Sequence, residues 1–449
     1  MIYDFYLIIL LFITITLIVI FISKLEVHPF LTLLFAGLFF GLFSGMQLKT
    51  IASSLTSGFG STLSSIGIVI VTGTIIGVFL EKTGGAMKIA ESLLKIFKDK
   101  SVPLVMNIMG FIVSIPVFCD SGFVILSSLN KALTKKAGLS LSVTAIALSL
   151  GLYATHTMVP PTPGPVAAAG ILHADLGLVI IFGLIVSIPV SITGLLFATH
   201  YGKKYYIEPE ACSENIKINE NLQNKPSFII SIMPIFIPIL LIVVKSISEY
   251  PGLHVRNELI KDILSFIGTP SIALLIGFLF CLLLPKNNEK SIFSTDGWVG
   301  IGVKNAAIII LITAAGGSFG QILRDSHLSD IIGNYFSNIN VGLLLPFIIA
   351  AALKTAQGSS TVAIITTASL IVPLLEPMHL SSEIAKGLVV VAIGAGSMVV
   401  SHANDSYFWV VTQFSNMGVK EGYKLQTMGT LISGCMGALV IFILSFILL

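Results

Sequence analysis

Charged residues are scarce in this chain of 449 residues, of which Asp, Glu, Lys and Arg together make up only 10%. Soluble globular proteins carry about 25% charged residues, and hydrophobic residues make up 55% of this sequence. The composition therefore indicates an integral membrane protein. The net charge of +3 does not indicate a nucleic-acid partner, because the lysines stand at the ends of apolar runs.

The sequence also lacks the motifs of metal, redox and hydrolytic sites. Its four cysteines are scattered, without the spacing of a metal site or a disulfide framework. The glycine-rich stretch 58–60 lacks the lysine of a phosphate-binding loop, and neither HExxH nor Gly-x-Ser-x-Gly occurs. We therefore expect no metal, no cofactor and no enzymatic activity.

Apolar runs of about 20 residues, the length that crosses a bilayer, recur along the whole chain. They predict an all-α integral membrane protein with about ten transmembrane helices plus two re-entrant hairpins. The first run, 3–22, follows no basic segment and is long enough to span, so we interpret it as a span rather than a cleavable signal peptide. At 85–100, apolar and charged residues alternate at helical spacing, which predicts an amphipathic helix on the membrane surface.

Two polar stretches interrupt apolar runs in a way that predicts broken helices. The stretch 156–165 contains four prolines between 160 and 165, and these cannot continue a helix. An external loop is the alternative, but the corresponding stretch 401–406 interrupts an apolar span without such prolines. We therefore expect broken helices at 139–172 and 384–412.

Two further polar stretches each join a pair of apolar segments that are too short to span. These stretches are 119–122 and 354–361. Two half-length helices joined by a polar tip enter and leave the membrane on one side. The pattern predicts re-entrant hairpins at 103–133 and 341–375.

The same order of elements occurs in residues 1–200 and 227–449. The first part contains three spans, the amphipathic helix, a hairpin, a broken helix and a span at 177–198. A polar stretch, 201–226, joins the two parts and is the predicted cytoplasmic linker. Each part then holds five full crossings, and because five is odd, the parts are predicted to be inverted repeats.

Basic residues fit this topology. When the first hairpin opens to the cytoplasm, most of the 25 Lys and Arg residues fall on the cytoplasmic side, in agreement with the positive-inside rule. Both chain termini are then predicted to be extracytoplasmic.

Inverted symmetry is expected to bring the four polar stretches together near the bilayer midplane. Half-helix N-termini there present unpaired N–H groups and positive dipole ends, which suit an anionic ligand. We predict a substrate site for a small organic anion, with these residues: Asp120, Ser121, Gly122, His156, Thr162, Gly164, Lys354, Gln357, Gly358, Ser359, Ser360, Thr361, Ser401, His402 and Asn404. The alternative is that the small residues only permit close helix packing.

Ionisable residues at membrane depth are costly, so each is a candidate functional group. Asp120, His402 and Asp405 are predicted proton-coupling residues, because burial and neighbouring charges can bring such groups into the range of a proton carrier. The alternative for His156 is a structural histidine at a helix end. Lys354 either pairs with the substrate carboxylate or extends toward water.

Four motifs together resemble the gluconate permease family of proton symporters over essentially the whole chain. They are Val159-Pro-Pro-Thr-Pro-Gly-Pro165, Gly358-Ser-Ser-Thr-Val-Ala363, the stretch 397–409 (SMVVSHANDSYFW) and His28-Pro-Phe30. The resemblance implies proton-coupled uptake of a sugar acid across the bacterial inner membrane, most simply gluconate. It also implies an elevator-like movement and a possible homodimer.

Departures from the family pattern concern the substrate. Gluconate carriers show Glu-Val-Gly where this chain has Asp120-Ser-Gly122, and often Pro-Pro-His-Pro where it has Pro160-Pro-Thr-Pro163. Lys354-Thr-Ala-Gln357 stands where those carriers have a segment that contains leucine or arginine. The alternatives are therefore a symporter for D-serine or a glycerate-like compound, or a passive anion channel or exchanger.

Overall fold

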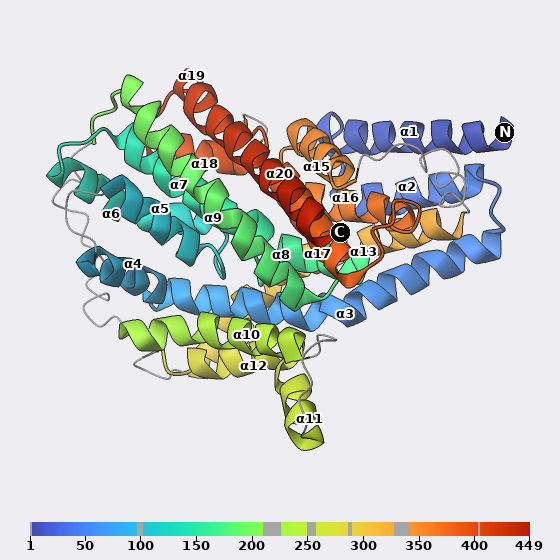
Figure 1. Cartoon of the computed structure of the whole chain (residues 1–449), viewed down its shortest axis with the longest axis horizontal. Helices are drawn as coiled ribbons and strands as arrows, with labels where there is room; N and C mark the ends of the chain where they lie inside the picture. The colour runs from blue at the N-terminus through green and yellow to red at the C-terminus, as the bar shows by residue number, and fades with distance from the viewer. Residues whose placement is uncertain are drawn as a thin grey trace.

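The computed structural model describes residues 2–96, 102–209, 226–248, 257–285, 290–326, 342–402 and 405–449. The regular elements in these ranges are all helical, as the sequence predicts. They are of two kinds: long apolar helices, and pairs of short helices separated by a few non-helical residues (Figure 1).

The N-terminal part of the chain forms four helices. They are α1 (Ile2–Ser23), α2 (Pro29–Phe43), α3 (Leu48–Lys82) and α4 (Gly85–Ile96). With 35 residues, α3 is longer than the span predicted at 61–80, and it bends by 45° between Ser64 and Gly67. α4 lies where the amphipathic helix is predicted and buries Ala86 and Ile89.

Five helices follow and contain the first two breaks. They are α5 (Val102–Val113), α6 (Cys119–Lys136), α7 (Leu141–Met158), α8 (Pro163–Leu172) and α9 (Leu176–His200). α5 and α6 lie where the first hairpin is predicted, and α7 and α8 are the two parts of the first broken helix. Of the predicted linker 201–226, residues 201–209 and 226 belong to the described part, with a 3-10 turn at Gly202–Lys204.

The described residues from 226 onward form ten further helices. They are α10 (Phe228–Ser248), α11 (Glu258–Ile267), α12 (Pro270–Cys281), α13 (Trp298–Asp325), α15 (Leu344–Gln357), α16 (Ser360–Ile371), α17 (Glu383–Ser397), α18 (Ser406–Phe414), α19 (Val419–Gly422) and α20 (Met428–Leu448). Short 3-10 turns lie at Lys290–Phe293 and Val372–Leu374, and a π-helical turn at Tyr423–Thr427 precedes α20. α11 is amphipathic without a fully buried residue and projects from the body of the molecule (Figure 1).

The interrupted helices, rather than the long ones, form the centre of the protein. Every residue of α7 and of α8 is buried, as are most residues of α16 and α17. A helix that is apolar and buried all round belongs to the interior of a large or membrane-embedded protein. The proline-rich break between α7 and α8 is therefore an interior feature and not an external loop.

Long helices around this centre expose large apolar side chains, for example Phe12 of α1, Leu196 of α9 and Phe446 of α20. Such a surface suits a lipid environment. Among the described residues, five helices are long and apolar enough to cross a membrane, and seven if each of two bent pairs counts as one span. The protein is thus a multi-span membrane protein, and the count of ten spans stays a prediction.

Elements at equivalent places in the two halves of the chain make equivalent contacts. α5 packs on α7 as α15 packs on α17, and α6 contacts α18 as α16 contacts α8. α3 packs along α13, each being the long helix before a hairpin (Figure 1). These contacts bring the two hairpins and the two broken helices to a common centre.

Candidate functional site

The second hairpin breaks at Gly358, whose φ of 86° lies in the left-handed region that favours glycine. The predicted tip 354–361 is shorter in the structure, because α15 continues to Gln357 and α16 begins at Ser360. Ser359 caps α16 by accepting a hydrogen bond from the Val362 N–H at 3.3 Å. The break therefore consists of two residues, of which Gly358 is buried and Ser359 is exposed.

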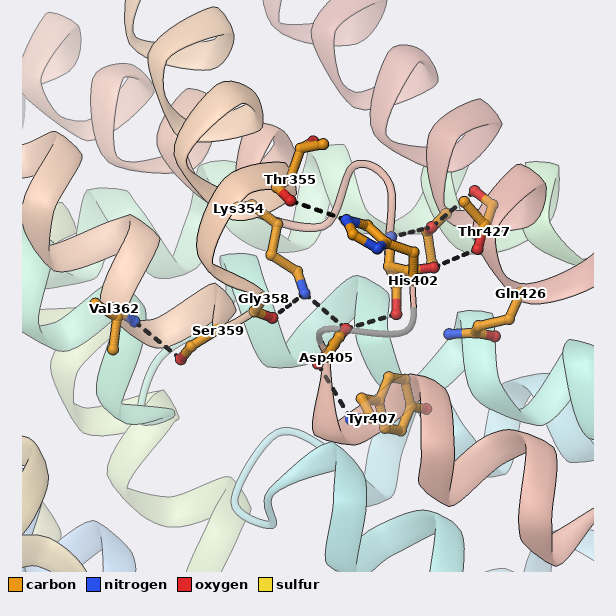
Figure 2. A network of polar contacts seen from close by, with 12 residues as sticks. Lys354, Thr355, Gly358, Ser359, Val362, His402, Asp405, Tyr407, Gln426 and Thr427 are labelled. Atoms are coloured by element: carbon orange, nitrogen blue, oxygen red, sulfur yellow. Dashed lines mark hydrogen bonds and ion pairs between the residues drawn. The ribbon is translucent and has the colours of Figure 1, made fainter. Parts of the chain in front are cut away.

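Lys354 lies in the last turn of α15, and its side chain is 0% exposed. Its ammonium group points into the protein and not toward water. It donates hydrogen bonds to the Gly358 carbonyl oxygen and to Asp405 Oδ2, the latter at 2.6 Å (Figure 2). A buried cation needs a partner of opposite charge, because an isolated charge in such a place is very costly. Asp405 is that partner.

Asp405 is the N-cap residue of α18, and its side chain is 6% exposed. Its Oδ1 accepts a hydrogen bond from the Tyr407 N–H at 3.1 Å, and its Oδ2 accepts one from the Ser401 hydroxyl at 2.5 Å. Together with Lys354, these donors surround the carboxylate (Figure 2). The pair is electrically neutral as a whole.

Hydrogen bonds between side chains and backbone groups fix the non-helical residues of the second broken helix beside this pair. The Ser401 N–H donates to Thr430 Oγ1 at 3.0 Å, and Thr427 Oγ1 donates to the Ser401 carbonyl at 2.5 Å. His402 Nε2 lies 2.8 Å from the Thr355 carbonyl oxygen, so this imidazole ties the break to α15 (Figure 2). Asn404, a predicted substrate ligand, lies outside the described residues.

In the first hairpin the break precedes the predicted tip. The non-helical residues are 114–118, and Asp120, Ser121 and Gly122 lie in the first turn of α6. Gly122 packs against Leu152, and a Cβ atom there would be 2.7 Å from Leu152 Cδ2. Asp120 Oδ1 is buried and has no hydrogen-bond partner among the described residues. An acceptor without a donor at this place is a candidate ligand-binding atom.

His156 occupies the last turn of α7, where it is buried between the rings of Phe118 and Tyr153. Its Nδ1 has no hydrogen-bond partner in the described part of the chain. Both His156 and Asp120 interact electrostatically with Lys354 and Asp405. Groups from all four breaks therefore lie close to the same ion pair.

Two predicted ligands of the first broken helix have structural contacts instead. Thr162 occupies the N-cap position of α8, and its hydroxyl donates to the Val159 carbonyl at 2.6 Å instead of capping the helix. Gly164 lies against α16, where a Cβ atom would be 2.8 Å from Ile364 Cδ1. In the second hairpin, Ser360 is buried and Thr361 half-buried.

Three residues that the sequence did not single out belong to the same cluster. Tyr153 is 1% exposed, and its hydroxyl group faces Ser360 without a hydrogen bond of normal geometry to any described residue. Tyr407 packs on Tyr153 with ring centroids 5.0 Å apart and donates its hydroxyl hydrogen to the Ser149 carbonyl. Gln426 Oε1 accepts from the Ser149 hydroxyl at 2.8 Å, and its Nε2 has no partner in the described ranges.

A sequence signal exists for Tyr153 but not for Gln426. Tyr153 stands three residues before His156, and residues at that spacing share a helix face. Gln426 is positioned by the π-helical turn Tyr423–Thr427, which the sequence does not announce. Such turns occur frequently at functional sites.

Buried broken helices around an ion pair, inside a shell of lipid-facing helices, define a membrane transport protein. The YdaH transporter of Alcanivorax borkumensis shares this fold, with a TM-score of 0.61, 14% identity and coverage of 89% of each chain. Residues 6–447 match the model of the GntP family permeases, and the chain belongs to this family.

Relatives in the family carry several names. The chain is 34% identical to a gluconate permease of Pseudomonas aeruginosa, covering 99% of both chains. It is 34% identical to the D-serine transporter DsdX of Escherichia coli, covering 98% of both. It is 32% identical to the Gnt-II system L-idonate transporter of Escherichia coli, covering 93% of this chain and 94% of the relative. The resemblance to the gluconate permeases is confirmed, and the protein is a transporter rather than an enzyme.

Proposed function

We propose that this permease is a proton-coupled symporter that takes up a small hydroxylated carboxylate, most simply gluconate or a related sugar acid. The observation that carries the proposal is the buried Lys354–Asp405 pair, beside which lie polar atoms that have no hydrogen-bond partner among the described residues. A buried cation suits a carboxylate, and neighbouring carboxylates can carry a proton. The relatives' named substrates support this chemistry, since gluconate and L-idonate each combine a carboxylate with several hydroxyl groups, and D-serine combines a carboxylate with one hydroxyl and an amino group.

The hydroxyl groups of the substrate form hydrogen bonds with side chains of α6, of α7 and of the π-helical turn that precedes α20. Asp120 Oδ1, His156 Nδ1, the Tyr153 hydroxyl and Gln426 Nε2 offer both acceptors and donors that lack partners among the described residues. Leaving such groups unpaired costs about 1–3 kcal/mol each. A polyhydroxylated ligand satisfies them, and an apolar anion of the same size does not.

The membrane arrangement of this symporter is that of two inverted repeats, 1–200 and 227–449. The equivalent contacts of α5 with α7 and of α15 with α17 support this arrangement. The bacterial inner membrane, with both termini extracytoplasmic, is the proposed location. A 33% identical relative in Escherichia coli is named an inner membrane permease.

Uptake by reconstituted protein tests the proposed function. In proteoliposomes with an imposed pH gradient, acidic outside, labelled gluconate is expected to accumulate above its external concentration. A competition panel of gluconate, L-idonate, D-serine and glycerate then ranks the substrates. Flux that is independent of the proton gradient and never exceeds equilibrium would indicate a passive anion channel. Uptake that requires a counter-substrate inside the vesicles would indicate an exchanger.

Replacing Tyr153 with Phe separates substrate binding from stability. The Tyr153 hydroxyl makes no regular hydrogen bond to a described residue, so the thermal stability of the empty protein is expected to stay the same. Loss of a hydrogen bond to substrate is expected to raise KM by roughly three- to tenfold. Uptake kinetics and thermal unfolding in detergent measure the two effects.

Tyr407→Phe is the matched control for this variant. The Tyr407 hydroxyl already donates to the Ser149 carbonyl at 3.0 Å. Its removal is expected to lower the stability of the empty protein by about 1 kcal/mol with a smaller effect on KM. An unchanged KM in Tyr153→Phe would contradict a role of this hydroxyl in substrate recognition.

A further inference from the structure

We propose that Asp405 is the resting counter-ion of Lys354, that the substrate carboxylate takes its place, and that the displaced Asp405 then binds the transported proton. This inference rests on the proposed function. It adds which residue binds the substrate carboxylate, which residue binds the proton, and how the charges balance. Asp405 presents to Lys354 the same chemical group that the substrate carries. The structure therefore already contains a stand-in for the carboxylate.

The geometry of Lys354 makes this exchange the natural way to bind an anion. Its side chain is 0% exposed, and its hydrogen bonds go to Asp405 Oδ2 at 2.6 Å and to the Gly358 carbonyl. An anion reaching Lys354 while Asp405 stayed charged would place two carboxylates beside one buried cation. Like charges at such short range cannot both stay ionised. Substrate binding and proton binding are thereby linked.

The surroundings of Asp405 favour protonation once Lys354 is engaged elsewhere. Its Oδ1 stays bonded to the Tyr407 N–H, and the ionised carboxylate would have to remain buried without its cation. In the described part of the chain, the titratable groups that interact with it, besides Lys354, are Cys119, Asp120, Tyr153, His156 and Tyr407. One of these groups is a second carboxylate, Asp120.

The charges balance at each step. In the empty site, Lys354 carries +1 and Asp405 carries −1. In the loaded site, Lys354 carries +1, the substrate carboxylate −1, and Asp405 is neutral after taking one proton from the solution on the loading side. The empty and loaded sites thus have equal charge. The transport cycle of a monocarboxylate moves one proton with each anion and transfers no net charge across the membrane.

The exchange also orients the substrate. Its carboxylate lies at the C-terminal end of α15, and its hydroxyl groups extend toward α6 and α7. Asp120 Oδ1, His156 Nδ1 and the Tyr153 hydroxyl, all buried and unpartnered among the described residues, lie on that side. A hydroxyl-bearing tail is therefore required for tight binding, and a simple carboxylate such as acetate is expected to bind weakly.

Transport under a clamped membrane potential tests the charge balance. Gluconate uptake by the wild-type protein is measured in proteoliposomes with potassium and valinomycin. A cycle that moved one net charge would change the accumulation ratio roughly fiftyfold per 100 mV, whereas the exchange predicts no dependence on potential. A tenfold outward gluconate gradient is expected to be balanced by an inward proton gradient of about one pH unit. Charge movement or another ratio would overturn the inference.

Three variants test the residues. Asp405→Asn is expected to lose accumulation driven by the pH gradient by more than an order of magnitude while retaining exchange of labelled for unlabelled gluconate. Lys354→Met is expected to lose both. The double variant Lys354→Met/Asp405→Asn removes both charges, and is expected to remain monodisperse and to bind no gluconate.

Asp325→Asn is the matched control. Asp325 also accepts a hydrogen bond from a serine hydroxyl, that of Ser54 at 2.6 Å, but it lies at the C-terminal end of α13. This variant is expected to keep coupled uptake. Coupled accumulation by Asp405→Asn, or normal gluconate binding by monodisperse Lys354→Met or by the double variant, would overturn the exchange alone. Absence of pH-driven uptake in the wild-type protein, for every compound of the panel, would instead contradict the proposed function.

Discussion

Lys354→Met is expected to destabilise the empty protein by about 3–5 kcal/mol, because it leaves the buried Asp405 carboxylate without its cation. Asp405 then keeps the Ser401 hydroxyl and the Tyr407 N–H as donors, and these do not replace a full charge. Thermal unfolding in detergent at neutral pH measures the loss. The loss is expected to shrink at acidic pH, where protonation of Asp405 removes the uncompensated charge.

The double variant Lys354→Met/Asp405→Asn is expected to recover most of that stability. Replacing a whole buried ion pair by neutral groups of similar volume is often neutral or stabilising. A double-mutant cycle over the wild type, the two single variants and the double variant gives the coupling energy. Additive losses in the cycle would contradict direct pairing of the two residues.

Gly151→Leu is expected to disrupt the packing of α5 on α7 and to cost roughly 3 kcal/mol or more. A Cβ atom at Gly151 would lie 2.2 Å from the Asn107 carbonyl oxygen, a backbone atom that cannot move aside alone. Because α7 is buried along its whole length, the added side chain has no surface to turn toward. The measurement is the yield of monodisperse protein and its unfolding temperature.

Gly60→Ala is the matched control for helix glycines. A Cβ atom at Gly60 meets nothing within 4 Å, although the residue lies within α3. Alanine has the higher helix propensity by about 1 kcal/mol, so this variant is expected to be as stable as the wild type or more stable. Equal losses in Gly151→Leu and Gly60→Ala would show that the α5–α7 contact is not the cause.

The sequence predicts the helical class and the approximate places of the four breaks. Prolines, glycines and polar clusters cannot continue an apolar helix, so the interruptions near 156–165 and 401–406 are visible without a structure. The edges of the breaks are less predictable. Asp120 lies within the first turn of α6, where the free N–H groups and the positive helix end favour an acidic residue. Gln357 ends α15, because Lys, Ala and Gln are good helix formers and continue the helix into residues that the pattern assigns to a tip.

The sequence does not predict which residues that are far apart along the chain pair with one another. Lys354 and Asp405 each stand out as charges in apolar surroundings, yet their contact depends on how α15 and α18 meet. The spacing of Tyr153 and His156 places them on one helix face, but it does not show that the Tyr153 hydroxyl faces Ser360. The position of Gln426 depends on a π-helical turn. Hydrophobic periodicity reports which residues are buried, but it does not report which buried polar atoms lack a partner.

Asp405 does more than face Lys354, because it also caps α18. The positive end of a helix dipole and the N–H groups of the first turn hold a carboxylate more strongly than a neutral carboxyl. Any event that neutralises Asp405 therefore loosens the start of α18 and, with it, the contact of α18 with α6. The protonation state of the Asp405 carboxylate thus controls how firmly α18 packs on α6, two short helices that come from opposite halves of the chain.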